Sequence, residues 1–311
     1  MRLSAFSLPA FCTNRLRPLR ERGWTAISAA DYSAAWARWG GSVATHPDVV
    51  SRLSVLAEIP VDYFGWFAGD ELQAAIPTWG RHLALAREVL KKTGKRGVFD
   101  LGNAEILLPV APQSRGVALR HRAHYLGALH ADQIATLRPQ REQLMLARAP
   151  EEYGKKFLYN QRRERRLLEE NGGQIVPLQD VPADDIAAMY ELLFEKRWGF
   201  AVPGKHYLAR VFSALRPFMV GHLIRIDGQP AAIQIVYRVE APGWLSAEYI
   251  NGGVDPACNA LGPGSVLTFV NTQSAWEEAR ALGKALRYSF GRADREYKAR
   301  WCHSVPVFTT G

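Results

Sequence analysis

The segment from Trp244 to Phe290 constrains the fold of this chain more than any other. It reads as an apolar strand over Trp244–Ile250, a turn containing Gly262 and Gly264, a helix, and a second strand over Leu286–Phe290. Apolar residues spaced for one buried helix face are Val266, Leu267, Phe269, Val270, Trp276, Ala279 and Leu282. Strands joined through a crossover helix are parallel neighbours, so we expect a sheet with at least one parallel pair.

Two further strands precede this segment. The runs Val220–Ile226 and Ala231–Val239 are apolar and are separated by the turn Asp227-Gly228-Gln229, which predicts a hairpin. Pro242-Gly243 then leads into the strand at Trp244. Antiparallel hairpins followed by a parallel crossover predict an α/β (α+β) protein with a mixed sheet.

The start of the crossover helix is a candidate phosphate site. Asn259-x-x-Gly262-x-Gly264 leads directly into Ser265, which is the predicted N-cap. A helix that opens on glycines offers free backbone N–H groups and the positive end of its dipole to a pyrophosphate. The alternative is that Gly-Pro-Gly-Ser only marks a turn and a helix start.

The strand order and the glycine pattern resemble the GNAT acyltransferase fold. In that family two neighbouring strands splay apart and a thioester cofactor lies between them, with its pyrophosphate on the glycine loop. The resemblance implies acyl-coenzyme A as donor, held by Asn259, Gly262, Gly264 and Ser265. Asn259 stands where the family usually has Arg or Gln, so another phosphate-bearing donor remains an alternative.

The C-terminal residues are similar to the ending of the Fem aminoacyltransferases, a branch of the GNAT superfamily. The similarity covers Phe290-Gly291-Arg292-Ala293-Asp294, the pair Tyr297-Lys298, and Trp301. In Fem-like enzymes the lysine of this pair lies at the acyl-transfer centre. The resemblance therefore implies a catalytic Lys298 and allows aminoacyl-tRNA as the donor.

A wider resemblance, to the Mig-fourteen family, covers roughly residues 24 to 310. It rests on Gly40–Val50, Ile106–Pro109, Ala111-Pro112, Asp227–Pro230, Asn251–Val254 and Pro263–Ser265. These bacterial GNAT-like proteins are associated with resistance to cationic antimicrobial peptides. Their reaction is not implied by the resemblance.

Length and landmarks divide the chain into two lobes. At 311 residues the chain is long enough for about two domains. We expect a basic, flexible tail over residues 1–23, a degenerate GNAT-like lobe over 24–149, and a GNAT-like lobe with the donor site over 150–311. In the first lobe we expect a helix over Ala29–Trp39, a second helix beginning at His46-Pro47, and a strand over Ala104–Val110.

Basic residues are concentrated on one predicted helix. The formal net charge is +9, and a helix over Glu151–Asn171 carries Lys156, Arg162 and Arg163 among other cations. These side chains could bind the phosphates of a lipid, a nucleotide-linked precursor or RNA. The alternative is an ordinary solvated helix face.

Three residues, Lys298, Glu248 and Tyr297, are candidates for catalysis, and Arg292 is a candidate for binding substrate. Lys298, beside Tyr297, could stabilise a developing oxyanion or hold a donor phosphate. Glu248, on the third strand, could act as general base if it faces the site, and its neighbour Tyr249 then points to the opposite side. Arg292 could bind substrate phosphate or form a structural ion pair with Asp294.

Several features bear on cofactors and location. The chain has three cysteines at unrelated spacings and no histidine cluster, so neither disulfides nor a metal site is predicted. No apolar run approaches the roughly 18 to 20 residues that span a bilayer. The stretch Leu3–Phe11 is followed by arginines, which favours a membrane-surface tail over a secretory signal. We expect a cytoplasmic protein, with peripheral binding at the inner membrane as an option.

Two functions remain open from the sequence. The first is an acyl- or aminoacyltransferase acting on an amine or hydroxyl of a small-molecule or cell-envelope acceptor, with tRNA as a possible partner. The second is a catalytically silent GNAT-like protein that binds anionic membrane or nucleic acid. The paired glycines and Tyr297-Lys298 favour the enzyme.

Overall fold

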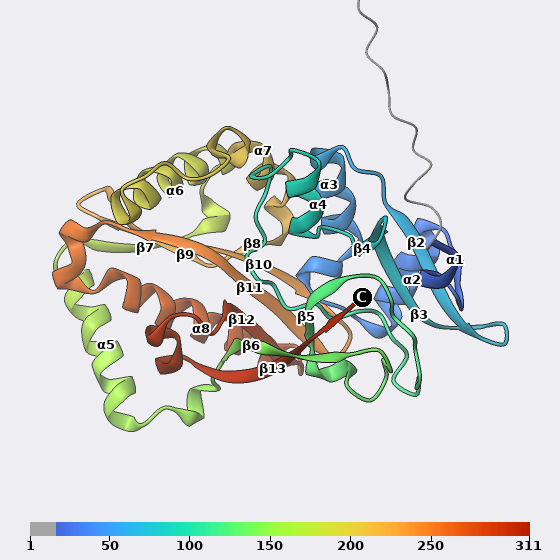
Figure 1. Ribbon diagram of the computed structural model, residues 1–311. Helices are drawn as coiled ribbons and strands as arrows, with labels where there is room; N and C mark the ends of the chain where they lie inside the picture. The colour runs from blue at the N-terminus through green and yellow to red at the C-terminus, as the bar shows by residue number, and fades with distance from the viewer. Residues whose placement is uncertain (1–16) are drawn as a thin grey trace, which may run out of the picture.

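The computed structural model describes residues 17–311 and contains two β-sheets (Figure 1). One sheet has four strands in the order β1-β2-β3-β4, and the other has nine, eight of them in the order β5-β13-β6-β12-β11-β10-β9-β7 with β8 paired to β10. The expectations for Leu3–Phe11 and for residues 1–16 of the tail lie outside the described residues. A short helix, α1 (Arg17–Arg20), precedes the first strand.

The small sheet forms the core of the N-terminal part. Its antiparallel strands are β1 (Trp24–Ala26), β2 (Asp62–Ala68), β3 (Glu71–Trp79) and β4 (His82–Leu83). Helices α2 (Ala29–Trp39) and α3 (Pro47–Ala57) lie beside it, and α4 (Arg87–Lys92) follows β4. Ser28 caps α2 through a capping box with Asp31, and the His46 side chain accepts a hydrogen bond from the Asp48 amide at the start of α3. Both predicted helix starts are thereby confirmed.

The large sheet confirms the predicted order of the C-terminal part. Its strands are β5 (Ala123–Gly127), β6 (Arg138–Ala147), β7 (Gly173–Pro177), β8 (Met219–Val220), β9 (His222–Ile226), β10 (Gln229–Glu240), β11 (Trp244–Val254), β12 (Ala285–Arg292) and β13 (Cys302–Thr310). Strands β11 and β12 are paired in parallel through α8 (Pro263–Ala281), and the other pairs are antiparallel. The fold is the expected mixed α/β fold.

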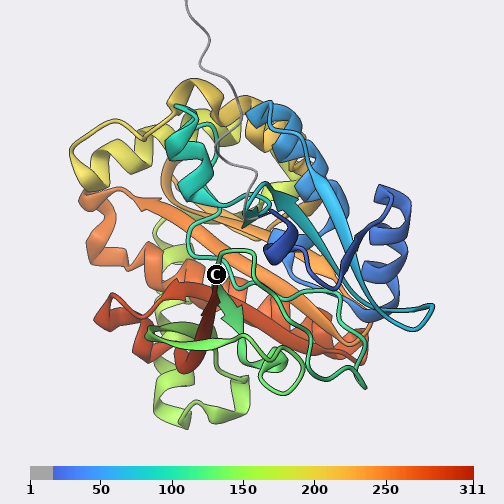
Figure 2. The same cartoon turned by 45° about the vertical axis from the view of Figure 1, so that its right-hand side comes forward.

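Helices cover both faces of the large sheet, as Figures 1 and 2 show. Helix α8, with α5 (Lys155–Glu170) packed against it, covers one face, while α6 (Ala183–Trp198) and α7 (Leu208–Ala214) cover the other. Because α8 is enclosed between the sheet and α5, residues on several of its faces are buried. Leu282 is an exception to the predicted buried face, since it is the C-cap of α8 and is exposed.

Strands from both sides of the boundary expected at residues 149/150 pair in the same sheet. β5 and β6 belong to the first segment by sequence, yet they pair with β13 and β12 in the large sheet. The two predicted lobes therefore share a sheet.

The predicted strand over Ala104–Val110 is wrong. This segment forms only isolated bridges, such as those from Ile106 to Leu126 and from Val110 to Ala74. Its backbone instead bonds to the segment between α2 and α3: the Leu107 carbonyl accepts from Ser42 N–H and Thr45 Oγ1, and the Leu107 amide donates to Ser42 Oγ. The residues of Ala104–Val110 are apolar because they are buried in a segment that links other parts of the fold, and not because they form a strand; we call them the linking segment.

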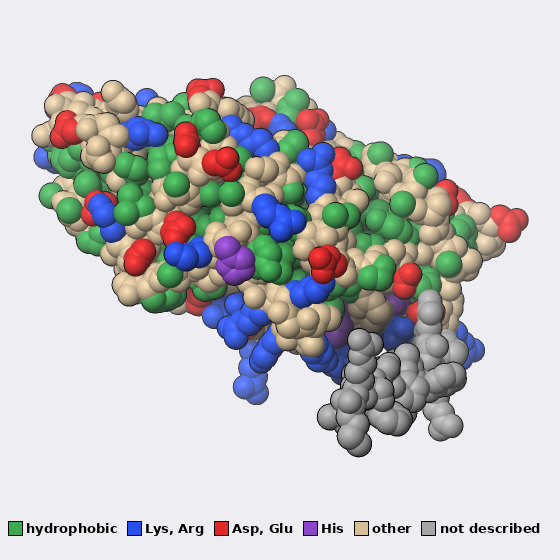
Figure 3. Space-filling view, turned by 90° about the horizontal axis from the view of Figure 1, so that it is seen from above, with side chains coloured by type: hydrophobic (Ala, Val, Ile, Leu, Met, Phe, Trp, Pro, Cys, Tyr) green, Lys and Arg blue, Asp and Glu red, His purple; other side chains and the backbone are tan. Residues whose placement is uncertain are grey.

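The excess positive charge is unevenly spread. Lys and Arg side chains collect along one edge of the surface shown in Figure 3, whereas basic and acidic side chains are interspersed over the rest of that face. Such a local basic surface favours anionic partners.

Acid is expected to weaken the fold through His121. The side chain is fully buried, and neither ring nitrogen has a hydrogen-bond partner within residues 17–311. Burial lowers the pKa of His121 from 6.5 to about 3. The unfolded chain therefore binds a proton that the folded chain does not, so the free energy of unfolding falls below about pH 6.5 by about 1.4 kcal/mol per pH unit. Urea titrations should show that His121→Phe reduces this slope, while His206→Phe, at an exposed position, leaves it unchanged.

Candidate functional site

The two parallel strands of the large sheet separate halfway along their length. Register between β11 and β12 runs from Trp244 opposite Ala285 to Glu248 opposite Ser289 and then stops. On the other side of β11, Tyr249 pairs with Val236 and Asn251 with Ile235, which leaves Ile250 as an extra residue. Such a bulge bends a strand and re-aims its side chains. The strand separation thus begins after Glu248, and the bulge at Ile250 lies two residues beyond it.

Aromatic side chains fill the α8 side of this separation. The Tyr249 and Phe290 rings lie 5.4 Å apart and nearly perpendicular, and Phe290 also contacts Tyr288 at 5.1 Å. Phe157 of α5 packs on Trp301 at 5.2 Å in the same hydrophobic cluster. A cofactor that lay between β11 and β12 from this side would have to displace these rings.

The glycine loop differs from the prediction at Ser265, which is not the N-cap. Gly262 is the cap, in a left-handed conformation with φ 59°, and Pro263 is the first helical residue. The Gly262 carbonyl accepts from the amides of Ser265 and Val266. The Ser265 hydroxyl instead donates to Gln161 Oε1 on α5 at 3.1 Å.

This loop does not fit a pyrophosphate. The amide of Gly262 donates to the Asn259 carbonyl, Pro263 has no N–H, and of residues 262–266 only Gly264 retains an unused amide. The Glu164 carboxylate lies beside the helix start, where its Oε2 would be 3.9 Å from a Cβ added at Gly262. A carboxylate there takes the place that a helix N-terminus offers to an anion and would repel a diphosphate.

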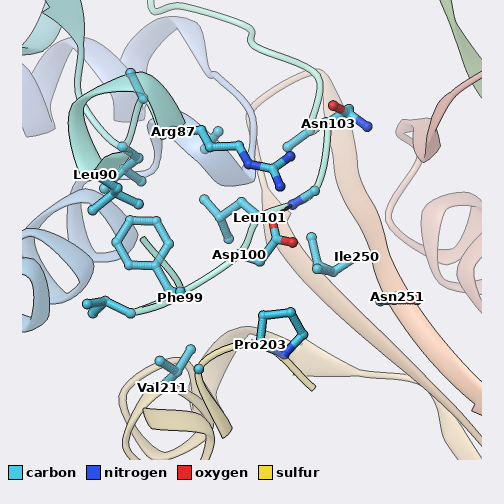
Figure 4. Close-up of a pocket in the computed structure, with 18 of the residues that line it drawn as sticks. Arg87, Leu90, Phe99, Asp100, Leu101, Asn103, Pro203, Val211, Ile250 and Asn251 are labelled. Atoms are coloured by element: carbon cyan, nitrogen blue, oxygen red, sulfur yellow. Dashed lines mark hydrogen bonds between the residues drawn. The ribbon is translucent and has the colours of Figure 1, made fainter. Parts of the chain in front are cut away.

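A cavity of about 620 Å³ lies on the opposite face of the sheet. Its walls come from the N-terminal part (α4, residues 96–106 and β5), from α6, α7 and the loop between them, and from β10 and β11. We call it the interlobe pocket (Figure 4). Ile250 and Asn251 line it, so the pocket reaches the place where β11 leaves β12. A volume of this size is typical of small-molecule sites.

The pocket has an apolar side and a polar side. Leu90, Phe99 and Val211 lie together on one side in Figure 4, and Asn103 and Asn251 lie on the other. The Arg87 side chain reaches in from α4 towards Leu101. Four arginines line the pocket, and Arg87, Arg96 and Arg122 form no ion pair within the described residues.

Strained backbone also borders the pocket. Leu85 and Tyr125 line it, and both have positive φ, 65° and 59°, which non-glycine residues rarely adopt. Conformations of this kind persist where surrounding structure fixes them, and they cluster at functional sites. Two of the four non-glycine residues with positive φ in residues 17–311 thus line the interlobe pocket.

Lys298 stands behind the pocket wall in a chain of polar contacts. Its buried ammonium donates to the Arg292 carbonyl at 2.7 Å and to Asp294 Oδ1 at 2.9 Å. Arg292 in turn pairs with Glu142 at 2.7 Å, and the Tyr125 hydroxyl donates to Glu142 at 2.7 Å. Arg292, Glu142 and Tyr125 all line the pocket. Burial, followed by the bond to Glu142, raises the pKa of Tyr125 to about 12.

Comparison with known proteins now identifies the family. The Mig-14 family model matches residues 46–310. The chain belongs to the Mig-14 family. The predicted resemblance is thereby confirmed.

A solved structure supports the same fold for this Mig-14 family member. The crystal structure of FemX matches with a TM-score of 0.52 at 10% sequence identity, covering 92% of this chain and 96% of FemX. A tandem GNAT protein from the clavulanic acid biosynthesis pathway matches with a TM-score of 0.48 at 12% identity, covering 93% of this chain and 97% of that one. No curated protein matches the sequence. The fold is similar to that of FemX.

Glu248 lies outside the pocket lining. The side chain is buried, and its Oε1 accepts from the Glu105 amide at 2.9 Å, while the Glu105 carboxylate is held by Arg287. Burial, with the neighbouring Glu105 adding to it, raises the pKa of Glu248 well above its usual range. This placement suits a fixed contact between the linking segment and β11.

Glu248→Gln is expected to stabilise the Mig-14 family chain at alkaline pH. A carboxyl whose pKa is raised in the folded state favours folding below its unfolded pKa and loses that contribution as pH rises through its folded pKa. Glutamine keeps an acceptor for the Glu105 amide without a buried charge. Urea unfolding at two pH values should show the gain growing with pH. A variant that is less stable than wild type at high pH would show that Glu248 is needed as a charged group.

The remaining predicted binding residues lie away from the pocket. Lys156, Arg162 and Arg163 are exposed on α5, which packs against α8 on the other face of the sheet. Asn259 is exposed beside the glycine loop, and Tyr297 is 42% exposed on the short helix η9 (Glu296–Arg300). The structure therefore brings Lys298 and Arg292 together near the pocket and leaves the other candidates apart.

Sequence reasoning missed most pocket residues. Arg87, Asp100 and Asn103 come from a helix and a loop with no recognisable motif, and they meet β11 only through the tertiary fold. The one available signal was the run Asp100-Leu101-Gly102-Asn103, whose polar residues and glycine are typical of a loop that approaches a ligand.

Two further properties of residues 17–311 concern metal ions and membranes. Within residues 17–311, no three His, Cys, Asp or Glu side chains cluster in a way that could hold a metal ion. Helices in the same range are all too short or too polar to cross a membrane.

Proposed function

We propose that the protein transfers an acyl or aminoacyl group to an amine or hydroxyl of an acceptor bound in the interlobe pocket. The observation that carries this proposal is the position of the pocket at Ile250 and Asn251, where β11 leaves β12. An acceptor there lies against the only place where the sheet's parallel pair opens. Proximity of acceptor and donor carbonyl is the main requirement for such a transfer.

The charged side chains of the pocket suit this chemistry. Attack by an amine or hydroxyl needs a proton acceptor and a positive group near the developing oxyanion. Among the pocket carboxylates, Glu142 is paired with Arg292 and Glu88 faces His124, whereas Asp100 has no cationic partner within residues 17–311. Asp100 would accept the proton, Arg292 would stabilise the oxyanion, and Lys298 would position Arg292.

An aminoacyl-tRNA is the donor class that the surface favours. Past the bulge, Arg197 donates to the Gly252 carbonyl at 3.1 Å, and both Arg197 and Arg295 lie over the Trp198 ring, at 4.8 and 5.7 Å. Trp198 and Tyr297 are partly exposed. Exposed aromatic rings flanked by arginines are suited to stacking the unpaired nucleotides of an RNA end. Acyl-coenzyme A remains the second donor candidate, without support from the glycine loop.

A thermal-shift titration separates the two donors. Aminoacyl-tRNA at a hundredfold excess over its dissociation constant stabilises the folded state by about 2.7 kcal/mol. We expect this shift for wild type, a smaller one for Trp198→Ala, and none with acyl-coenzyme A. A shift with acyl-coenzyme A alone would overturn the donor assignment.

The second candidate function is binding without catalysis, and one observation favours it. Arg165 and Arg166 pair with Glu169 and Glu170 on α5, but Lys155, Lys156, Arg162 and Arg163 form no ion pair among the residues that the structure describes. Four unpaired cations on one helix could hold an anionic membrane or nucleic acid. Retention of full transfer activity after all four are changed to glutamine would separate this surface from catalysis.

A further inference from the structure

We infer that the acceptor in the interlobe pocket is an anionic amphiphile, an aliphatic chain that ends in a phosphate or carboxylate head. The inference rests on the proposed function in one respect only, which is that the bound molecule is the acceptor of the transfer. Binding in the pocket can be measured without turnover.

The apolar side of the pocket fits an aliphatic chain. Leu90, Phe99, Val202, Val211 and Phe212 line it, and each is almost completely buried in the protein. These side chains have no polar atoms to satisfy, so a chain of methylenes could lie among them without an unpaired hydrogen-bonding group. A purely polar substrate would leave this wall without complementary contacts.

The polar side fits an anionic head. Arg87 reaches into the pocket, and neither it nor Arg96 or Arg122 has an ion-pair partner in residues 17–311. Of the lining acids, Glu142 is neutralised by Arg292, and Asp100 Oδ1 accepts from the Gly102 amide at 2.8 Å. The unpaired arginines therefore outnumber the unpaired carboxylates. Guanidinium groups recognise phosphate and carboxylate oxygens in pairs.

The arrangement also places the reacting group. With the chain against α4 and α7, the head lies towards Asn103 and Asn251, beside the bulge at Ile250. Asp100 and Arg292 line the same pocket and are the groups that would act on a hydroxyl or amine of that head. In the transfer, this group forms a bond to the donor carbonyl carbon and its proton passes to Asp100; the bond from that carbon to the donor's ribose oxygen then breaks, and Asp100 returns the proton to the ribose oxygen.

The test is calorimetric titration of the full chain with hexyl, octyl and decyl phosphate. Burial of each methylene is worth about 0.8 kcal/mol, so Kd is expected to fall about fifteenfold for every two methylenes added. Arg87→Gln is expected to raise the Kd of decyl phosphate at least tenfold and to leave the Kd of decanol unchanged. Arg210→Gln, an exposed α7 arginine outside the pocket, is the matched control and should bind like wild type.

Two results would overturn the inference: a Kd independent of chain length, or equal losses in Arg87→Gln and Arg210→Gln. Val211→Trp, which fills the apolar side, should weaken the binding of decyl phosphate and of decanol alike. Its melting temperature reports whether the variant folds. Competition by phosphatidylglycerol vesicles would identify a membrane lipid as the source of the amphiphile, and competition by soluble alkyl phosphates alone would identify a soluble one. Binding without transfer would overturn the proposed function and leave this inference standing.

Discussion

Replacing Gly204 with alanine is expected to cost about 3 kcal/mol or more of the free energy of unfolding. Gly204 has φ 70°, and a Cβ added to it would overlap the backbone carbonyl of Gly97. Both residues line the interlobe pocket, where the α6–α7 loop meets the segment after α4. Neither backbone can move away without opening the pocket wall, so the clash cannot be relieved cheaply.

Gly199→Ala is the matched control for that experiment. Gly199 has φ 74°, but no atom lies within 4 Å of an added Cβ. Its cost is limited to the left-handed backbone, about 1 kcal/mol. Urea unfolding of the two variants should therefore differ by about 2 kcal/mol. Equal losses would mean that Gly97 and Gly204 do not approach each other as the structure has them.

Lys298→Ala is expected to abolish transfer and to lower the free energy of unfolding by about 2 kcal/mol. The ammonium is the partner of the Arg292 carbonyl and of Asp294, and alanine leaves both without it. Arg292 would then lose the support that aims it into the pocket. Transfer activity should be lost even at moderate temperature, where the Lys298→Ala variant is still folded.

Lys205→Ala provides the comparison for Lys298. Lys205 pairs with Glu191 on the surface, where ion pairs contribute about 0 to 1 kcal/mol. Thermal melts and transfer assays on both variants show whether an effect comes from the place of Lys298 near the pocket or from the loss of one positive charge anywhere. If Lys298→Ala transferred the acyl group at the wild-type rate, Lys298 would have no role in the transfer.

The sequence predicted the local elements well because their signals are local. Alternating and helical apolar patterns gave β9 to β12 and α8, and the capping residues Ser28 and His46 gave the starts of α2 and α3. The family was also readable, since its motifs are contiguous. Lys298 and Arg292 could be selected for the same reason.

The errors came from interactions between distant segments. Nothing near Ala104 indicates that Leu107 bonds to Ser42, between α2 and α3, and nothing near Ser265 shows that its hydroxyl donates to Gln161 on α5. The Glu164 carboxylate beside Gly262 is equally invisible in the sequence, yet it changes the glycine loop from a phosphate site into a helix start facing an acid. The pocket itself exists only because the linking segment, α7 and β11 meet.

The most direct test of the account is a transfer assay with radiolabelled aminoacyl-tRNA and a total lipid extract, in which label in the organic phase is counted. We predict label that depends on the protein, is lost in Lys298→Ala and Arg87→Gln, and is kept in Arg210→Gln. Label independent of the protein, or equal label in Arg87→Gln and wild type, would contradict the claim that the interlobe pocket holds the acceptor.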